Sequence, residues 1–295
     1  MDKSDLVLVT GAGGLVGSAI VDLLKVQGFS RIVGIRRQDC DLSDLVATQL
    51  LFEKIRPDHI LHAAALVFGI GGNLLKQGQS FLENTLINTS VIDAARHVGV
   101  KKITVMGTGA AYPFPSQKLP LAEDTIFNGR PHPSERGYAH AKRGMLAMLE
   151  AYENSYGLNW AYIVSCNLFG PRDKFDIANG HVIPSLVRKF YEAKRIGDPV
   201  FVWGDGSAQR DFMYVKDAAR AALIVMNQVN GLVNMGSGRV YSIKEIVGML
   251  SAITKMAEIV WEISKPNGQD YRAYDLQRLM ATGFKCEYSI ERGLE

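Results

Sequence analysis

The sequence predicts an α/β fold in which helices cover both faces of a doubly wound, parallel sheet. Two observations lead to this fold class. Short, continuous apolar runs alternate with stretches that carry apolar residues at helical spacing, and glycines directly follow the first of these runs. Strands that are buried on both faces and separated by helices form parallel sheets through right-handed crossovers. The first half of the chain therefore predicts a sheet of this kind.

The first predicted strand is the apolar run at 6–10, and the first predicted helix covers 15–26. The same alternation continues along the chain. Further strands are expected at 31–35, 59–64, 102–106 and 160–165, and further helices at 45–54, 81–97 and 138–156.

Beyond Asn167 the alternation loosens into segments that contain Gly and Pro, followed by helices expected at 215–227 and 243–255. This part predicts a smaller C-terminal α/β lobe that is interleaved with the end of the sheet. We expect a sheet domain at 1–165 with a returning segment at about 208–235, and most of the second lobe at 166–295.

Composition argues against several classes of protein. The 295 residues carry a net charge of +3 and the basic residues are scattered, so they form no nucleic-acid footprint. No apolar stretch approaches the roughly 20 residues of a membrane-spanning helix, and the first is too short for a signal peptide. Cys40, Cys166 and Cys286 are too far apart for a disulfide framework or a usual zinc site. We expect a cytoplasmic protein without a metal, and a small anionic ligand fits the composition.

A glycine-rich turn joins the first strand to the first helix and places glycines at positions 11, 14 and 17. Gly11, Gly14 and Gly17 permit a tight turn, a close approach to a pyrophosphate and close packing of helix on sheet. The helix that begins with Leu15 and Val16 favours negative charge at its N-terminus. The motif predicts a Rossmann-like domain that binds a dinucleotide, and a simple turn is the alternative.

The second strand ends in Arg36 and Arg37, where an NAD-binding protein typically has an acidic residue for the ribose hydroxyls. Arginine stays charged and binds a 2′-phosphate in a bidentate manner, so the sequence favours NADP, used as NADPH. Two surface arginines placed there by chance are the alternative. Asp41 and Leu42 would contact the adenine side, although Asp41 would serve equally well as a cap before the next helix.

Tyr138 and Lys142 are four residues apart in a predicted helix, so they lie on one face and one turn apart. An isolated tyrosine, with a pKa of about 10, is a poor proton shuttle at neutral pH. A nearby ammonium stabilises the phenolate and brings the hydroxyl towards the working range. Such a pair alone is more often a solvated helix face, but the preceding glycine turn favours a catalytic role.

Thr108 lies just beyond the strand predicted at 102–106, at the carboxyl edge where open α/β sheets bind their ligands. Its hydroxyl would hold a substrate carbonyl beside Tyr138. A threonine that only caps a turn is the alternative.

Together, these motifs resemble those of the extended short-chain dehydrogenase/reductases. The resemblance is carried by the glycine turn, Ala63-Ala64-Ala65, Thr108, Tyr138 with Lys142, and the segment 167–171. Other segments are similar to one subgroup, the GDP-L-fucose synthases, which epimerise and reduce a GDP-linked keto sugar. These segments are 65–70, 179–184, 202–204, 210–212 and 265–268. The likeness covers almost the whole chain.

The resemblance implies a role for each matching residue. Tyr138 would be the catalytic acid, Lys142 would tune it and bind the nicotinamide ribose, and Thr108 stands where the family usually has serine. Further cofactor contacts would come from Ala63, Ala64, Ala65, Asn167, Leu168 and His181. In the substrate-binding lobe, contacts to the nucleotide sugar would come from Lys189, Trp203, Arg210 and Asp275. For Trp203, an ordinary core position is the alternative. A homodimer formed by two helices of the sheet domain is also implied.

One departure from the family pattern concerns epimerisation. The family moves protons beside the ketone with a cysteine and a histidine. The histidine matches His181, which would be catalytic, but the cysteine position holds Ala110, which cannot move a proton. We therefore expect NADPH-dependent reduction, at C4, of a nucleotide-linked 4-keto-6-deoxy sugar or a close relative. The resemblance implies that the nucleotide is GDP. We expect weak or absent C3/C5 epimerase activity. Candidate substitutes for the cysteine are His132, His140 and Tyr112.

Three other functions remain open for this sequence. They are a bifunctional 3,5-epimerase/4-reductase with a substitute acid, an NAD-retaining nucleotide-sugar 4-epimerase, and a non-catalytic dinucleotide-binding sensor of the same fold. A dehydratase is disfavoured, because Gly109 and Ala110 stand where dehydratases usually carry extra acidic residues.

Overall fold

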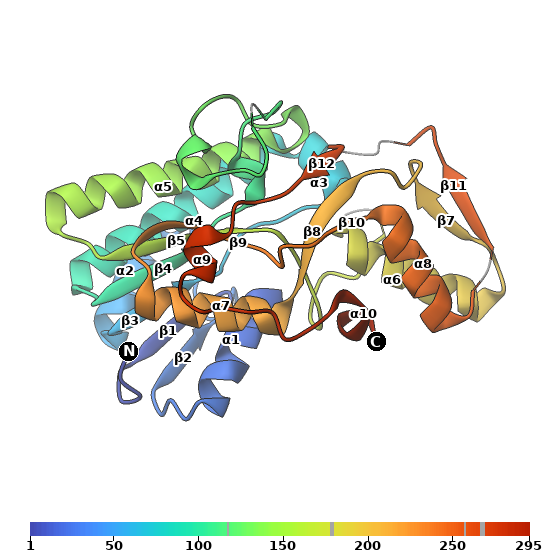
Figure 1. Ribbon diagram of the computed structural model, residues 1–295. Helices are drawn as coiled ribbons and strands as arrows, with labels where there is room; N and C mark the ends of the chain where they lie inside the picture. The colour runs from blue at the N-terminus through green and yellow to red at the C-terminus, as the bar shows by residue number, and fades with distance from the viewer. Residues whose placement is uncertain (117, 178–179, 257, 266–268) are drawn as a thin grey trace.

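The structure is a computed structural model that describes residues 1–116, 118–177, 180–256, 258–265 and 269–295. Its largest feature is a six-stranded parallel sheet with the order β2-β1-β3-β4-β5-β9 (Figure 1). The strands are β1 Val7–Thr10, β2 Ile32–Ile35, β3 His59–His62, β4 Lys102–Met106, β5 Trp160–Ser165 and β9 Gly231–Met235. The strand order reverses direction between β1 and β3. In such sheets ligands bind at the carboxyl edge beside this reversal.

Helices cover both faces of the large sheet (Figure 1). On one face α1 Leu15–Val26 packs with α7 Val215–Gln228. On the other face lie α2 Leu45–Ile55, α4 Gln77–Val98 and α5 Arg136–Tyr156. The short helix α3 Ile70–Leu75 comes directly before α4 in the chain. The predicted doubly wound α/β fold class is confirmed.

The remaining elements form two small sheets at the other end of the molecule (Figure 1). One contains β6 Asn167–Phe169, β8 Gln209–Tyr214, β10 Val240–Ser242 and β12 Tyr271–Arg272, and the other contains β7 Val200–Trp203 and β11 Ile259–Glu262. The helices there are α6 Val182–Ile196, α8 Ile243–Thr254 and α10 Ile290–Leu294, while α9 Gln277–Met280 contacts β9 of the large sheet. The described residues also form the 3₁₀ turns η1 Gly109–Ala111, η2 Glu123–Thr125 and η3 Pro133–Glu135.

The buried apolar side chains gather in two clusters. The larger cluster fills the space around the six-stranded sheet and includes the fully buried Leu8, Ile60 and Tyr162. The smaller cluster, around β7, α6 and α8, includes Phe190 and Ile246. The larger cluster also includes Tyr274, Leu279 and Phe284 from the segment predicted to form the second lobe, so the predicted domain bounds stay a prediction.

Two kinds of feature are absent from the described part of the chain. None of its helices is long and apolar enough to cross a membrane. Within the same residues, no group of three or more His, Cys, Asp or Glu side chains could hold a metal ion.

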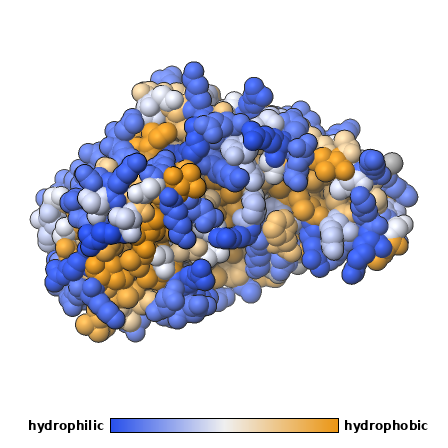
Figure 2. Space-filling model, turned by 90° about the horizontal axis from the view of Figure 1, so that it is seen from below, coloured by the Kyte–Doolittle hydropathy of each residue, from blue (hydrophilic) through white to orange (hydrophobic). Residues whose placement is uncertain are grey.

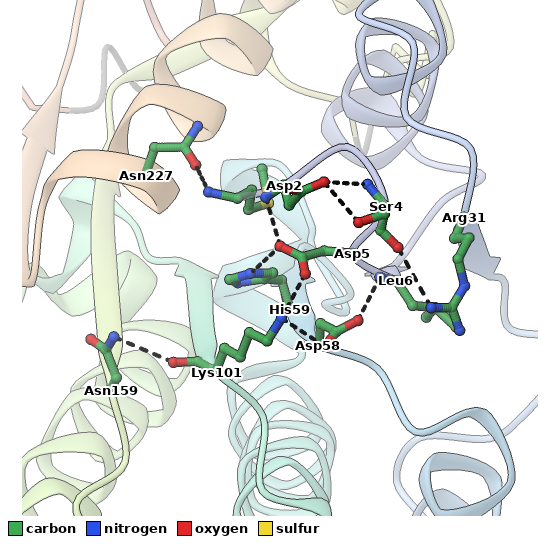
Figure 3. Close-up of polar contacts among 11 residues, drawn as sticks. Asp2, Ser4, Asp5, Leu6, Arg31, Asp58, His59, Lys101, Asn159 and Asn227 are labelled. Atoms are coloured by element: carbon green, nitrogen blue, oxygen red, sulfur yellow. Dashed lines mark hydrogen bonds and ion pairs between the residues drawn. The ribbon is translucent and has the colours of Figure 1, made fainter.

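A polar network closes the amino edge of the large sheet (Figure 3). The Asp5 carboxylate accepts a hydrogen bond of 2.6 Å from Nζ of Lys101 and one of 2.7 Å from the Asp2 amide. Nε2 of His59 lies 3.2 Å from Asp5, and Lys101 also bridges to Asp58 at 3.0 Å. The hydrogen bond from Lys101 lowers the pKa of Asp5 to about 2. The network ties the starts of β1, β3 and β4 together at the edge opposite the glycine turn.

Candidate active site

The glycine turn lies at the carboxyl end of β1, beside the reversal in strand order. Gly11 has a φ angle of +69°, and a Cβ atom there would come within 2.8 Å of the Ala63 backbone. A Cβ atom at Gly17 would overlap the Gly11 carbonyl oxygen. Gly14 caps α1 without a side chain, and the helix then begins with Leu15 and Val16. The turn therefore leaves a bare helix N-terminus, which suits a pyrophosphate.

A buried hydrogen-bond chain holds this turn in place. Oγ1 of Thr10 lies 2.7 Å from Nδ1 of His62 and accepts a bond of 3.3 Å from the Ala64 amide. Nε2 of His62 lies 3.2 Å from Oδ1 of Asn88 in α4. Burial lowers the pKa of His62 to about 3, so the ring is neutral. Because Oδ1 of Asn88 can only accept, Nε2 carries the proton and Nδ1 accepts from Thr10.

Arg36 and Arg37 lie in the exposed turn that follows β2. Cδ of Arg36 lies 3.6 Å from the position that a Cβ atom would take at Gly13, so this side chain covers the glycine turn. The Arg36 amide donates a hydrogen bond of 2.8 Å to the Asp39 carboxylate. Contact of Arg36 and Arg37 with the 2′-phosphate of NADP stays a prediction.

Asp41 and Leu42 follow the arginine turn. The Asp41 carboxylate accepts hydrogen bonds from the amide and the hydroxyl of Ser43, at 3.0 Å and 2.7 Å. These bonds lower the pKa of Asp41. Asp44, rather than Asp41, caps α2 by accepting from the Ala47 amide. Leu42 is buried, and the contact of this pair with adenine stays a prediction.

Tyr138 and Lys142 lie on one face of α5, with Nζ of Lys142 5.8 Å from the Tyr138 ring centroid. Nζ donates a hydrogen bond of 2.9 Å to the Met106 carbonyl oxygen, and burial lowers the pKa of Lys142 to about 7. Burial, with a smaller contribution from the Glu135 carboxylate, raises the pKa of Tyr138. The protein alone therefore does not lower the Tyr138 pKa, and the phenol stays protonated as a proton donor.

Thr108 lies at the carboxyl end of β4 and caps η1, which packs against α5. Its Oγ1 accepts a hydrogen bond of 3.2 Å from the Ala110 amide, which leaves its own hydrogen free to be donated to a substrate. A Cβ atom at Gly109 would overlap the Tyr274 hydroxyl. The Thr108 turn is therefore backed by a side chain from the C-terminal part of the chain.

Asn167 and His181 come from segments beyond β5. Asn167 and Leu168 are half-buried in β6, where Asn167 lies opposite Phe212 of β8. The His181 side chain is half exposed at the start of α6, and its Nδ1 lies 3.8 Å from Oδ1 of Asp173. Their contacts with cofactor and sugar stay predictions.

Lys189 and Trp203 form one exposed surface. Nζ of Lys189 donates a hydrogen bond of 2.8 Å to the Phe201 carbonyl oxygen and lies 5.2 Å from the Trp203 ring centroid. Nζ of Lys265 lies 5.7 Å from the same ring. Trp203 is 39% exposed, which makes it no ordinary core residue. An indole flanked by two cations can stack on a flat base and attract phosphate.

Two arginines from neighbouring strands lie side by side. Arg210 in β8 and Arg272 in β12 are partners in the parallel register. Burial, together with the nearby Arg272 charge, lowers the pKa of Arg210 to about 10. Nη2 of Arg272 lies 3.0 Å from Oε2 of Glu135, three residues before Tyr138. No motif in the sequence identifies Glu135 or Arg272, because their pairing joins positions 137 residues apart.

Asp275 follows this arginine pair in the chain. Its carboxylate accepts a hydrogen bond of 3.0 Å from the Gln277 amide, and its carbonyl oxygen accepts one of 3.0 Å from the Asn234 side chain. These contacts are structural, so the predicted contact of Asp275 with a nucleotide sugar stays a prediction. Asn179 and residues 266–268, which belong to the quoted motifs, lie outside the described residues.

The three candidate substitutes for the missing cysteine differ in position. Tyr112 is buried, and its hydroxyl donates a hydrogen bond of 2.6 Å to Asn234. His140 is exposed on α5 and, two residues after Tyr138, points away from it. Nδ1 of His132 lies 2.7 Å from the Ser134 hydroxyl, and burial lowers its pKa. The charges of Arg210 and Arg272 act on His132.

Known proteins resemble this chain over nearly its whole length. Residues 7–243 match the model of the NAD dependent epimerase/dehydratase family. The chain is 35% identical over 299 residues to the probable GDP-L-fucose synthase 1 of Oryza sativa subsp. japonica. The alignment covers 99% of this chain and 90% of that protein. The chain is 33% identical over 301 residues to the GDP-L-fucose synthase of Escherichia coli (strain K12), covering 98% and 94%.

Solved structures give the same result. A GDP-6-OMe-4-keto-L-xylo-heptose reductase from C. jejuni superposes with a TM-score of 0.93 at 27% identity, covering 100% of this chain and 96% of that one. MlghC, a GDP-mannoheptose C4 reductase from Campylobacter jejuni with NADP bound, gives 0.89 at 28% identity, covering 100% and 97%. The predicted resemblance is confirmed, and the chain belongs to the NAD-dependent epimerase/dehydratase family.

Proposed function

We propose that this protein catalyses the NADPH-dependent reduction of the C4 ketone of a GDP-linked 4-keto-6-deoxy sugar or a close relative. The observation that carries the proposal is the meeting of Tyr138, Lys142 and the Thr108 turn at the carboxyl edge of the sheet, the same edge that carries the glycine turn. The names of similar proteins, GDP-L-fucose synthases and GDP-heptose C4 reductases, support this substrate class.

The described residues fit NADP. The bare N-terminus of α1 suits the pyrophosphate, and Arg36 and Arg37 suit the 2′-phosphate. Similar chains have been solved with NADP or NADPH bound. When bound, NADPH supplies the hydride that reduces the keto carbon.

Tyr138 donates the proton that the reduced oxygen needs. Its raised pKa keeps the phenol protonated until negative charge develops on the substrate oxygen. Thr108 donates a hydrogen bond to the same oxygen and orients it. The resulting phenolate is stabilised by the Lys142 ammonium 5.8 Å from its ring and then takes a proton from solvent.

The nucleotide sugar binds in the second lobe. Arg210 and Arg272 take the diphosphate, since paired guanidinium groups match phosphate oxygens in charge and geometry. Trp203 and Lys189 take the base and the adjacent phosphate. The sugar then lies between this surface and Tyr138.

The first test is NADPH oxidation with GDP-4-keto-6-deoxy-mannose, followed by identification of the sugar product by NMR. We expect oxidation of NADPH and an unepimerised 6-deoxy sugar. GDP-L-fucose as the product would show that the protein is bifunctional. Absence of oxidation would remove this substrate and favour a 4-epimerase or a sensor.

We propose that C3/C5 epimerisation is weak or absent, because Ala110 carries no proton-transfer group. Its methyl group is also buried, at 3% exposure. Incubation of the keto sugar in deuterated water without NADPH should give little deuterium at C3 or C5. An Ala110→Cys variant should raise the exchange, while Ala110→Ser serves as the control of similar size. Rapid exchange in the unchanged protein would contradict the idea.

We also propose a homodimer. Large apolar side chains are exposed on two helices: Leu45, Val46 and Leu50 on α2, and Phe81, Leu82 and Leu86 on α4. Figure 2 shows that apolar residues gather at the end of the molecule where Figure 1 places α2 and α4. An exposed patch of this kind favours a protein contact. Light scattering should give twice the mass of 32.4 kDa, and Leu86→Glu should shift it towards the monomer.

A further inference from the structure

Arg272 already holds an anion, and that anion belongs to the protein. Nη2 of Arg272 lies 3.0 Å from Oε2 of Glu135, and the two side chains are 9% and 22% exposed. Nε of Arg272 donates a second bond, of 3.1 Å, to the Gln269 side chain. Nη2 of the guanidinium is thus engaged by a carboxylate and Nε by an amide oxygen.

The surroundings of Glu135 are strongly positive. The guanidinium of Arg210 donates to the Gln209 carbonyl oxygen, a neutral partner, at 2.7 Å. Nε of Arg136 is buried and has no hydrogen-bond partner within the described part of the chain. All of these charged groups lie close together, because each of them affects the pKa of His132. The groups are Glu135, Arg136, Arg210 and Arg272. Asp270 adds a further negative charge near Arg210. Among these groups, Glu135 is the carboxylate that bonds directly to an arginine of the proposed diphosphate site.

We propose that Glu135 is an internal substitute for phosphate, which occupies Arg272 in the free protein and is displaced by the diphosphate of the nucleotide sugar. This inference rests on the proposed function, because that function provides the displacing group. A buried guanidinium without a counter-ion is strongly unfavourable, so a carboxylate stabilises the empty site. A diphosphate brings more charge and more acceptor oxygens, and it replaces the carboxylate.

The position of Glu135 links this exchange to the catalytic helix. Glu135 ends η3, and Arg136 begins α5, which carries Tyr138 in its first turn. The Glu135 charge contributes to the raised pKa of Tyr138. Release of Glu135 from Arg272 therefore changes both the anchor of η3 and the surroundings of the proton donor.

The binding of GDP and of inorganic diphosphate to the NADP-loaded protein tests the exchange by calorimetry. In Glu135→Gln the side chain keeps its size but is uncharged, so it competes more weakly with phosphate for Arg272. Both ligands should therefore bind this variant on the order of 10-fold more tightly. A purely structural ion pair predicts the opposite sign, since its loss would loosen the site. Unchanged or weaker binding in Glu135→Gln would overturn the proposal.

Two further variants separate competition from other effects. Glu135→Asp keeps the charge and should bind both ligands with nearly wild-type affinity. Glu53→Gln removes the same charge from α2, where Glu53 pairs with His97 at 2.8 Å, and should change neither affinity by more than about 2-fold. An equal gain of affinity in Glu53→Gln would mean that the change in net charge causes the tighter binding, and it would overturn the proposal.

Thermal unfolding gives an independent readout should Glu135→Gln be less stable. GDP should raise the melting temperature of Glu135→Gln more than that of the wild type, because the ligand restores the missing anion. A smaller rise would overturn the inference. Failure of the wild type to bind GDP, with diphosphate still binding, would remove the GDP assignment and leave the exchange at Arg272 testable with diphosphate.

Discussion

Nζ of Lys142 lies 2.9 Å from the carbonyl oxygen of Met106, and this bond joins the Tyr138 face of α5 to the end of β4. The lysine is buried with a neutral acceptor and without a carboxylate partner at hydrogen-bond distance among the described residues. Burial alone lowers its pKa, from 10.5 to about 7. A functional cation thus lies where the fold disfavours its charge.

Replacement of Lys142 by Met should therefore stabilise the protein while abolishing turnover. The unfolded chain binds more protons than the folded one between the folded pKa of about 7 and the unfolded pKa of 10.5, so wild-type stability rises with pH in this window. Lys142→Met lacks this gain. Urea unfolding should show an advantage of several kcal/mol for the variant at pH 6.5, since one pKa unit corresponds to about 1.4 kcal/mol. The advantage should shrink by pH 10. An advantage independent of pH would refute the explanation.

Tyr138→Phe should lower turnover by about 10²- to 10⁴-fold, the usual contribution of a positioned proton donor. NADPH binding, followed by fluorescence, should stay unchanged because the ring remains. Tyr152→Phe is the matched control on the same helix, where the hydroxyl donates a hydrogen bond to Asp93 at 3.1 Å. Turnover that survives Tyr138→Phe would remove the assignment of the acid.

Arg36→Ala should weaken NADPH binding by about 10- to 100-fold, as expected for the loss of a charge-assisted bond to the 2′-phosphate. NADH lacks this phosphate, so its affinity should change little. Arg31→Ala, an exposed arginine at the opposite end of β2, provides the control. Equal losses for both cofactors would mean that Arg36 supports the turn rather than the phosphate.

Asp5→Asn should reduce stability in neutral solution by about 1 kcal/mol, a value that allows for solvent screening of the ion pair with Lys101. The folded pKa of Asp5, about 2, lies below the ordinary aspartate pKa of 3.8, so the ionised carboxylate stabilises the fold above pH 3.8. This stability is lost as the pH falls towards 2. Urea titrations of both proteins should therefore converge in acid, and a constant difference would contradict this assignment.

Much of the sheet domain can be predicted from the sequence. Helix α1 has its predicted bounds, because glycines flank it on both sides. Helix α4 begins at Gln77 rather than at the predicted 81, because its first turn is polar and apolar periodicity starts only at Phe81. Helix α6 is not predicted, since Pro184 reads as a helix breaker although it lies in the first turn, where proline is tolerated.

The second lobe is harder to predict for a physical reason. Its strands β10 and β12 have three and two residues, too few to show a periodic pattern. Their positions depend on pairing with β8 across long stretches of chain. Arg272 reaches Arg210 only through this register, so residue spacing identifies Tyr138 and Lys142 but neither Arg272 nor Glu135.

The contact between Gly109 and Tyr274 restricts the order in which this protein can change over evolution. Any side chain at 109 collides with the Tyr274 hydroxyl, so a substitution there is harmful while the tyrosine remains. A smaller residue at 274 would remove this contact at a cost of about 3–5 kcal/mol, the usual value for truncation of a buried aromatic ring. Positions 109 and 274, which are 165 residues apart, are therefore free to change only together or with a shift of the tyrosine ring.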